Sequence, residues 1–225
     1  MLPLHDRLLG QVLTERDRIL SRRSLLQGTA GIAGGIAALG ITAQVGGLNL
    51  GGLSTALAVD DAPFKDDAEV LNYALTLEHL EYAFYRDGVP MYEFGMDAFG
   101  NDIKSWLMAI GDHEKQHVDA LTAAVMQFNG TPVEEAKYDF GHTDAKSFLA
   151  TAAALENTGV MAYDGAGQYL TNMDLITAAG SIVAVEARHA SYLNLITGAE
   201  PAPEAFEQAK TPDEILKIAG PFIVQ

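Results

Sequence analysis

The chain contains no cysteine among its 225 residues. Disulfide bonds, thiolate nucleophiles, iron–sulfur clusters and zinc sites with cysteine ligands are therefore excluded. Any metal ion bound to this chain must be held by oxygen atoms and by imidazole nitrogen atoms.

Basic residues are scarce: 14 Lys and Arg stand against 30 Asp and Glu, which gives a formal net charge of −16. The imbalance is concentrated in residues 59–225, which carry 27 acidic and 9 basic side chains. Such a surface repels phosphate backbones and anionic lipids, so we expect no nucleic acid partner. The same charge favours solubility.

Charged residues are missing from Ser24–Val59, a run rich in Gly, Ala, Leu and Ile. The pair Arg22 and Arg23 directly precedes it, and the sequence ALA near its end offers small residues for cleavage. This pattern is typical of a twin-arginine export signal. An uncleaved membrane anchor is the alternative, because the run exceeds the roughly 20 residues that cross a bilayer. We therefore predict that residues 1–58 are a signal peptide or anchor, provide the only membrane contact, and place the remainder in the periplasm or another extracytoplasmic space.

Four long amphipathic segments, separated by Gly, Pro and Asn, dominate the rest of the chain, and no strand pattern is comparably strong. The predicted helices span 66–86, 101–128, 143–170 and 174–196. We predict an all-α fold in which residues 59–200 form a four-helix bundle. Residues 201–225, which include four prolines, are predicted to fold back across the bundle as a tail.

The sequence HEKQH at 113–117 matches the H-E-x-x-H motif of zinc peptidases. In a peptidase, His113 and His117 would bind zinc and Glu114 would act as general base. However, the spacing of apolar residues places Glu114 and His117 on the buried helix face and His113 at its edge. The pattern therefore favours an inward Glu-x-x-His pair over a peptidase site.

The fourth segment repeats this arrangement, and the first and third segments resemble each other. The first and third segments each have a glutamate in the apolar stripe and a tyrosine seven residues later. The residues of this repeat are Glu78, Tyr85, Glu114, His117, Glu156, Tyr163, Glu186 and His189. The chain thus contains two copies of one helical hairpin.

The negative charge of acidic side chains on four buried helix faces must be compensated by positive charge. Burying one unpaired carboxylate costs several kcal/mol, and converging carboxylates repel one another and raise each other's pKa. Two divalent cations would balance four carboxylates, and two imidazoles would add ligands without adding charge. We predict a site for two iron or two manganese ions, with Glu78, Glu114, His117, Glu156, Glu186 and His189 as metal ligands.

These motifs resemble the ferritin-like di-metal carboxylate proteins, in which two helices each donate a Glu and two each donate Glu-x-x-His. The nearest resemblance is to exported ferritin-like domain proteins of the desiccation-related branch. It covers residues 60–225 and includes the sequences NYALTLEHLEYAFY and YDFGHTD.

The resemblance implies that Glu114 and Glu186 bridge or chelate the two ions, that His117 and His189 each cap one ion, and that Glu78 and Glu156 are terminal carboxylates. It also implies a long crossover at 129–142 that makes the second and third helices parallel. The chain departs from rubrerythrins because it has no cysteine for a rubredoxin-like site. It also lacks the fifth-helix arrangement and basic surface that would argue for a storage cage.

Four further residues are candidates for supporting contacts. Glu81 follows Glu78 by three residues and lies on the same side of its helix. It can be an additional ligand, a residue that contacts the ligands or a partner of a basic residue. Tyr85 and Tyr163 can hydrogen-bond ligand carboxylates, although core packing explains them equally well. His113 is out of phase with the ligands.

The predicted function is redox chemistry on O2, peroxide or ferrous iron, as a ferroxidase, a peroxidase or a manganese-catalase-like enzyme. The alternative is a non-catalytic protein with a structural or degenerate metal site, either stress-protective or an anchored accessory protein. In either case the chain can act as a dimer or as a subunit of a larger complex.

Overall fold

The computed structural model describes residues 63–224 and two short paired strands, β1 (Gln44–Val45) and β2 (Leu48–Asn49). Apart from these strands, the predicted signal or anchor segment at 1–58 lies outside the described residues. The chain divides into the units Met1–Asp60 and Asp61–Gln225, and the second contains the bundle. Within the described part of the chain, no helix combines the length and apolar character needed to cross a bilayer.

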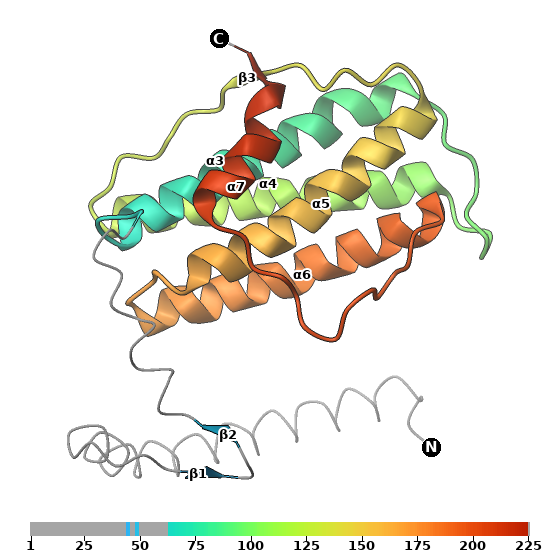
Figure 1. Cartoon of the computed structure of the whole chain (residues 1–225). Coiled ribbons are helices and arrows are strands. Elements are labelled where there is room, and N and C mark those ends of the chain that lie inside the picture. The colour runs from blue at the N-terminus through green and yellow to red at the C-terminus, as the bar shows by residue number, and fades with distance from the viewer. Residues whose placement is uncertain (1–43, 46–47, 50–62, 225) are drawn as a thin grey trace, which may run out of the picture. The chain divides into compact units, whose positions relative to one another are not determined.

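Four long helices form the bundle: α3 (Asp67–Gly88), α4 (Ile103–Gln127), α5 (Ala145–Gly167) and α6 (Met173–Thr197) (Figure 1). A short 3-10 helix, η2 (Val89–Met91), follows α3. Each long helix lies within a few residues of its predicted range. The predicted all-α four-helix bundle is confirmed.

Each long helix begins at an acidic or amide side chain that accepts a backbone N–H from the first turn. These N-cap residues are Asp66, Asp102, Asp144 and Asn172. Such a cap stabilises a helix by about 1 kcal/mol relative to alanine. Helix α6 ends at Gly198, whose φ of 85° is a left-handed conformation that glycine adopts without strain.

The segment between α4 and α5 runs along α3 and sets the topology. Near the start of α3, Asn72 Nδ2 donates to the carbonyl of Thr131 over 2.9 Å, and near its end Arg86 Nη1 lies 2.9 Å from Glu135 Oε2. The chain therefore travels the length of α3 before α5 begins. Since α4 runs antiparallel to α3, this crossover makes α4 and α5 parallel, as predicted.

The apolar core fills both ends of the bundle around a polar middle. Each helix contributes a fully buried apolar side chain, such as Leu75, Leu107, Phe148 and Leu193. Phe148 stacks on Phe84 with ring centroids 4.3 Å apart. These tightly packed layers fix the rotation of each helix, and thereby the direction in which its polar residues point.

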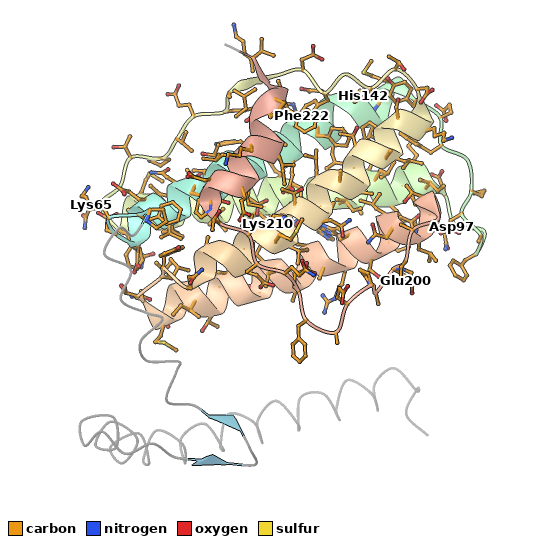
Figure 2. The ribbon with its side chains drawn as sticks, in the orientation of Figure 1. Lys65, Asp97, His142, Glu200, Lys210 and Phe222 are labelled. Atoms are coloured by element: carbon orange, nitrogen blue, oxygen red, sulfur yellow. The ribbon has the colours of Figure 1, made fainter. Side chains whose placement is uncertain are left out.

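The C-terminal residues pack on the bundle. Helix α7 (Pro212–Ala219) contacts α5 and buries Ile215 completely. After the 3-10 helix η3 (Gly220–Phe222), strand β4 (Ile223–Val224) pairs antiparallel with β3 (Lys137–Tyr138) of the crossover. In Figure 2, Lys210 lies beside α5, where Gly165 lets it approach, because a Cβ on that glycine would collide with the Lys210 carbonyl oxygen.

Candidate metal centre

The six residues predicted as metal ligands converge in the middle of the bundle. All four glutamates are fully buried, and His117 and His189 are buried as well. Their ligand atoms form two groups, in each of which all atoms lie within 4.8 Å of one another. One group is Glu78, Glu114, His117 and Glu186, and the other is Glu114, Glu156, Glu186 and His189. The two groups share Glu114 and Glu186.

Helical periodicity explains this convergence. Residues three apart on a helix lie on the same side, so Glu114 and His117 of α4 enter the interior together, and so do Glu186 and His189 of α6. Each of the other two helices contributes its glutamate from the middle of its apolar stripe. The repeated hairpin therefore produces two similar halves of one centre.

His117 is surrounded by carboxylate oxygens from three helices. Its Nδ1 lies 2.9 Å from Glu114 Oε2, 3.0 Å from Glu186 Oε1 and 3.3 Å from Glu78 Oε2. A single N–H group has one hydrogen to donate, so it cannot satisfy three acceptors. A divalent cation among these atoms could accept all of them as ligands.

His189 occupies the corresponding position in the other half. Its Nδ1 lies 3.0 Å from Glu114 Oε1 and 3.1 Å from Glu156 Oε2, while Glu186 Oε2 is 3.9 Å away. Each imidazole is thus flanked by one glutamate of its own half and by the two shared glutamates.

Several carboxylate oxygens in the centre accept no hydrogen bond. They are Glu78 Oε2, Glu81 Oε2, Glu114 Oε1 and both oxygens of Glu186. Leaving buried acceptors unpaired costs about 1–3 kcal/mol each, and more when they are charged. The residues therefore fit a site for bound cations, which would satisfy these oxygens.

Burial and mutual repulsion alter the acidity of the carboxyl groups. Burial raises the pKa of Glu78 to about 7, against the opposing effects of the nearby His117 ring and of the Tyr163 hydroxyl. Burial, reinforced by the other carboxylates, also raises the pKa values of Glu81 and Glu186 well above the usual range. Without metal, part of the centre therefore holds protons near neutral pH.

The pKa values of the two imidazoles are raised, although both rings are buried. Burial alone would lower the pKa of each ring, but the surrounding carboxylates outweigh it and raise the pKa of His117 to about 12 and of His189 to about 9. Burial likewise opposes the charge of Glu114, yet the two imidazoles beside it lower its pKa to about 2. In the metal-free centre, imidazolium groups thus act as the compensating cations.

Two tyrosines cross-link the halves of the centre. Tyr85 of α3 donates a 2.6 Å hydrogen bond to Glu156 of α5, and Tyr163 of α5 donates one to Glu78 of α3. Burial raises the pKa of both hydroxyls well above the usual range, so both remain donors. The predicted contact between tyrosines and ligand carboxylates is present, and each tyrosine bonds the glutamate of the other hairpin.

Glu81 lies next to the centre but outside both ligand groups. It is buried, and its carboxyl group faces Gly159 of α5. A Cβ on Gly159 would lie 3.0 Å from Glu81 Oε1 and 3.5 Å from Glu186 Oε2. This glycine, which sequence reasoning missed, creates the space for Glu81; its position three residues after Glu156 in a helix interior was the available signal.

His113 does not enter the centre. Its ring stacks on His189, with centroids 5.2 Å apart and planes 9° apart, and its Nδ1 lies 2.9 Å from His189 Nε2. It thus contacts the ring nitrogen of His189 that faces away from the carboxylates. The described residues therefore do not form the zinc site that the HEKQH motif would require, in agreement with the interpretation from its helical phase.

Comparisons with known proteins agree with this architecture. A family described as "Ferritin-like domain" matches residues 66–199. The solved structure of a conserved hypothetical protein from Mycobacterium tuberculosis is similar with a TM-score of 0.50 and 20% sequence identity, over 61% of this chain and 94% of that chain. No curated protein matches the chain.

Proposed function

Since the chain belongs to the ferritin-like domain family, we propose that its bundle holds two iron or two manganese ions and carries out redox chemistry on peroxide or dioxygen. The observation that carries the proposal is the pair of four-residue ligand groups that share Glu114 and Glu186. Two overlapping groups suit two adjacent ions better than one.

Charge balance supports this stoichiometry. The four carboxylates of the two groups carry a charge of −4 when ionised, which two divalent ions neutralise. Glu78 and His117 would complete one ligand set, and Glu156 and His189 the other. Carboxylate and imidazole ligands favour iron and manganese, and the chain offers no thiolate that would favour zinc or copper.

The surrounding residues would orient the ligands and store a proton. When bound, the ions would supply the electrons exchanged with the oxygen substrate. Tyr85 and Tyr163 hold the two terminal glutamates by hydrogen bonds, which fixes the direction of their carboxylates. Glu81 lies beside Glu186, and burial raises the pKa of its carboxyl group in the metal-free protein, so Glu81 would be the residue placed to hold and donate a proton here. The packed apolar layers above and below exclude water.

The proposal includes export. The twin-arginine pattern at residues 22–23 and the uncharged run after it are its support. This export route carries folded proteins, so the ions would be acquired before the chain leaves the cytoplasm. The family match begins at residue 66, which is consistent with a separate role for the preceding segment.

The test compares the full chain with two variants. Glu114→Gln removes a shared ligand with little change in size, and Glu204→Gln makes the same change at an exposed position of the C-terminal segment. Each protein is loaded with iron or manganese. The consumption of peroxide and the consumption or release of dioxygen are then measured. We expect turnover by the unmodified chain and by Glu204→Gln, and a loss of at least about 100-fold in Glu114→Gln.

Removal of the metal distinguishes the proposal from a structural metal site. Under the proposal, chelation abolishes turnover and reloading restores it. A protein that melts at a lower temperature after chelation but shows no turnover with either metal would instead have a structural centre, and the proposed function would be wrong.

A further inference from the structure

A surface cavity of about 350 Å³ lies between α4, α6 and the loop that precedes α4. This volume lies within the usual range of small-molecule sites. Its lining includes Phe99, Trp106, Ile110, His113, Arg188 and Tyr192. His189 also reaches the cavity, so its floor is the outer side of the metal centre.

The walls of the cavity are aromatic and incompletely covered. Trp106 and Tyr192 have ring centroids 6.2 Å apart with planes tilted by 55°. Trp106 is 49% exposed and Phe99 is 73% exposed, although burial of such rings is strongly favourable. The two rings of α4 and α6 thus leave apolar faces for a flat ligand.

The loop beside these rings is held in place rather than loosely attached. Asp97 Oδ1 accepts hydrogen bonds from the backbone N–H groups of Phe99 and Asn101 over 2.8 and 2.9 Å. Asp97 Oδ2 lies 3.5 Å from the Tyr192 hydroxyl, which joins the loop to α6. Figure 2 shows Asp97 at this end of the bundle. The cavity therefore has a preformed wall.

The polar groups of the cavity are suited to an anion. Among residues 63–224, no carboxylate lies within 4 Å of Arg188, although acidic residues outnumber basic ones threefold after residue 58. His113 uses Nδ1 toward His189, and its Nε2 makes no hydrogen bond with another described residue. One guanidinium and one imidazole nitrogen are thus available to a ligand.

We propose that this cavity binds an aromatic carboxylate of one or two rings. The ring lies against Trp106 and Tyr192, and the carboxylate pairs with the planar guanidinium of Arg188, which presents two parallel N–H donors. Arg188 is the one Arg or Lys among the lining residues, and the carboxylate of Asp97, which also lines the cavity, accepts hydrogen bonds within its own loop. The cavity therefore suits a monoanionic aromatic ligand better than a phosphate. This binding does not require the metal ions, so it stands independently of the proposed redox function.

The test is calorimetric titration of the full chain with 2-naphthoate, and with the neutral 2-naphthamide as comparator. We expect 2-naphthoate to bind with a Kd below about 1 mM. Trp106 is the only tryptophan of the chain, so its indole N–H resonance reports binding at this site directly. Both metal-loaded and metal-free protein are titrated.

Three variants locate the ligand. Arg188→Gln is expected to weaken 2-naphthoate binding roughly tenfold or more, and Trp106→Leu about as much. Lys217→Gln removes the same charge from the exposed face of α7 and should leave the affinity unchanged. Both mutated cavity residues are exposed, so the variants should fold, which circular dichroism verifies.

Four results of the titrations with ligands and variants would overturn the proposal. They are no binding at about 5 mM ligand, equal binding of the amide, equal affinities of the Arg188→Gln and Lys217→Gln variants, and unchanged affinity in Trp106→Leu. Binding that occurs only in the metal-loaded protein would also overturn it, because the carboxylate would then be a ligand of the metal.

Discussion

At the scale of single residues, Tyr85 and Tyr163 exchange partners between the two hairpins. Tyr85 bonds Glu156, and Tyr163 bonds Glu78, so each hairpin orients a carboxylate of the other. A buried hydrogen bond to a charged group is stronger than a neutral one. These two contacts therefore stabilise the association of the hairpins as well as the ligand positions.

Removing one of these hydrogen bonds measures its contribution to the free energy of unfolding. Tyr163→Phe leaves Glu78 without its hydroxyl partner, and we expect the free energy of unfolding of the metal-free protein to fall by about 1–3 kcal/mol. Tyr169→Phe removes a partly exposed hydroxyl that has no hydrogen-bond partner among the described residues, and should have an effect below about 0.5 kcal/mol. Urea denaturation measures both. Equal effects of the two changes would contradict this role of Tyr163.

Gly159 gives a second residue-scale prediction. Gly159→Ala should by propensity stabilise the α5 helix, but the new Cβ would stand 3.0 Å from Glu81 Oε1 and displace that carboxyl group. We expect Mn²⁺ affinity, measured by competition with a chelator, to fall roughly tenfold.

Gly180→Ala is the matched control, because it lies inside α6 with nothing within 4 Å of its added Cβ. It should raise the melting temperature and leave the affinity for Mn²⁺ unchanged. If Gly159→Ala behaves in the same way, the space beside Glu81 has no role in the centre.

At the scale of elements, the C-terminal segment joins the bundle to the crossover. Ile215 of α7 is buried against α5, and β4 pairs with β3 of the crossover. Phe222, labelled in Figure 2, packs on Phe140 of the crossover with ring centroids 5.7 Å apart. The segment thus holds in place the long connection that makes α4 and α5 parallel.

The contribution of α7 can be measured within that helix. Ile215→Ala should lower the free energy of unfolding by about 2–5 kcal/mol, because it empties a fully buried site. Ile218→Ala makes the same change at a side chain that is 39% exposed, and should cost less than about 1 kcal/mol. Similar destabilisation by the two changes would show that α7 does not contribute through its buried face.

The long helices could be predicted from the sequence, whereas the contacts between distant elements could not. The four long helices and the convergence of the six candidate ligands follow from one spacing rule, because helical phase decides which residues point inward. The eight-residue α7 is too short for that rule, although Thr211 and Glu214 form a readable capping box. The pairing of Lys137 with Val224 and the contact of His113 with His189 depend on how distant elements dock, so no local pattern reveals them.

At the scale of the whole molecule, metal ions would compete with protons for one centre. Glu78 and His189 have pKa values of about 7 and about 9 in the folded metal-free protein, both above their ordinary values. Groups with raised pKa values contribute stability that is complete at low pH and is lost as pH rises through the folded value. Metal ions need the deprotonated groups, so metal affinity changes in the opposite direction.

A pH series tests this competition. We expect the melting temperature of the chelated protein to fall between about pH 5 and about pH 9, and Mn²⁺ affinity to rise over the same interval. Glu114, with its pKa lowered to about 2, acts in the opposite sense only below its ordinary value. Glu78→Gln should make the decline in melting temperature shallower. A melting temperature that rises toward pH 9 without metal would contradict the account.

The central claim is that all four long helices hold two adjacent cations in common. The most direct measurement is an anomalous difference map from crystals of the protein purified from its own host, recorded on both sides of the iron and manganese absorption edges. The account predicts two peaks, each beside one imidazole, His117 or His189, and both in contact with Glu114 and Glu186. A map without peaks at these side chains, or with a single peak bound by one ligand group alone, would contradict it.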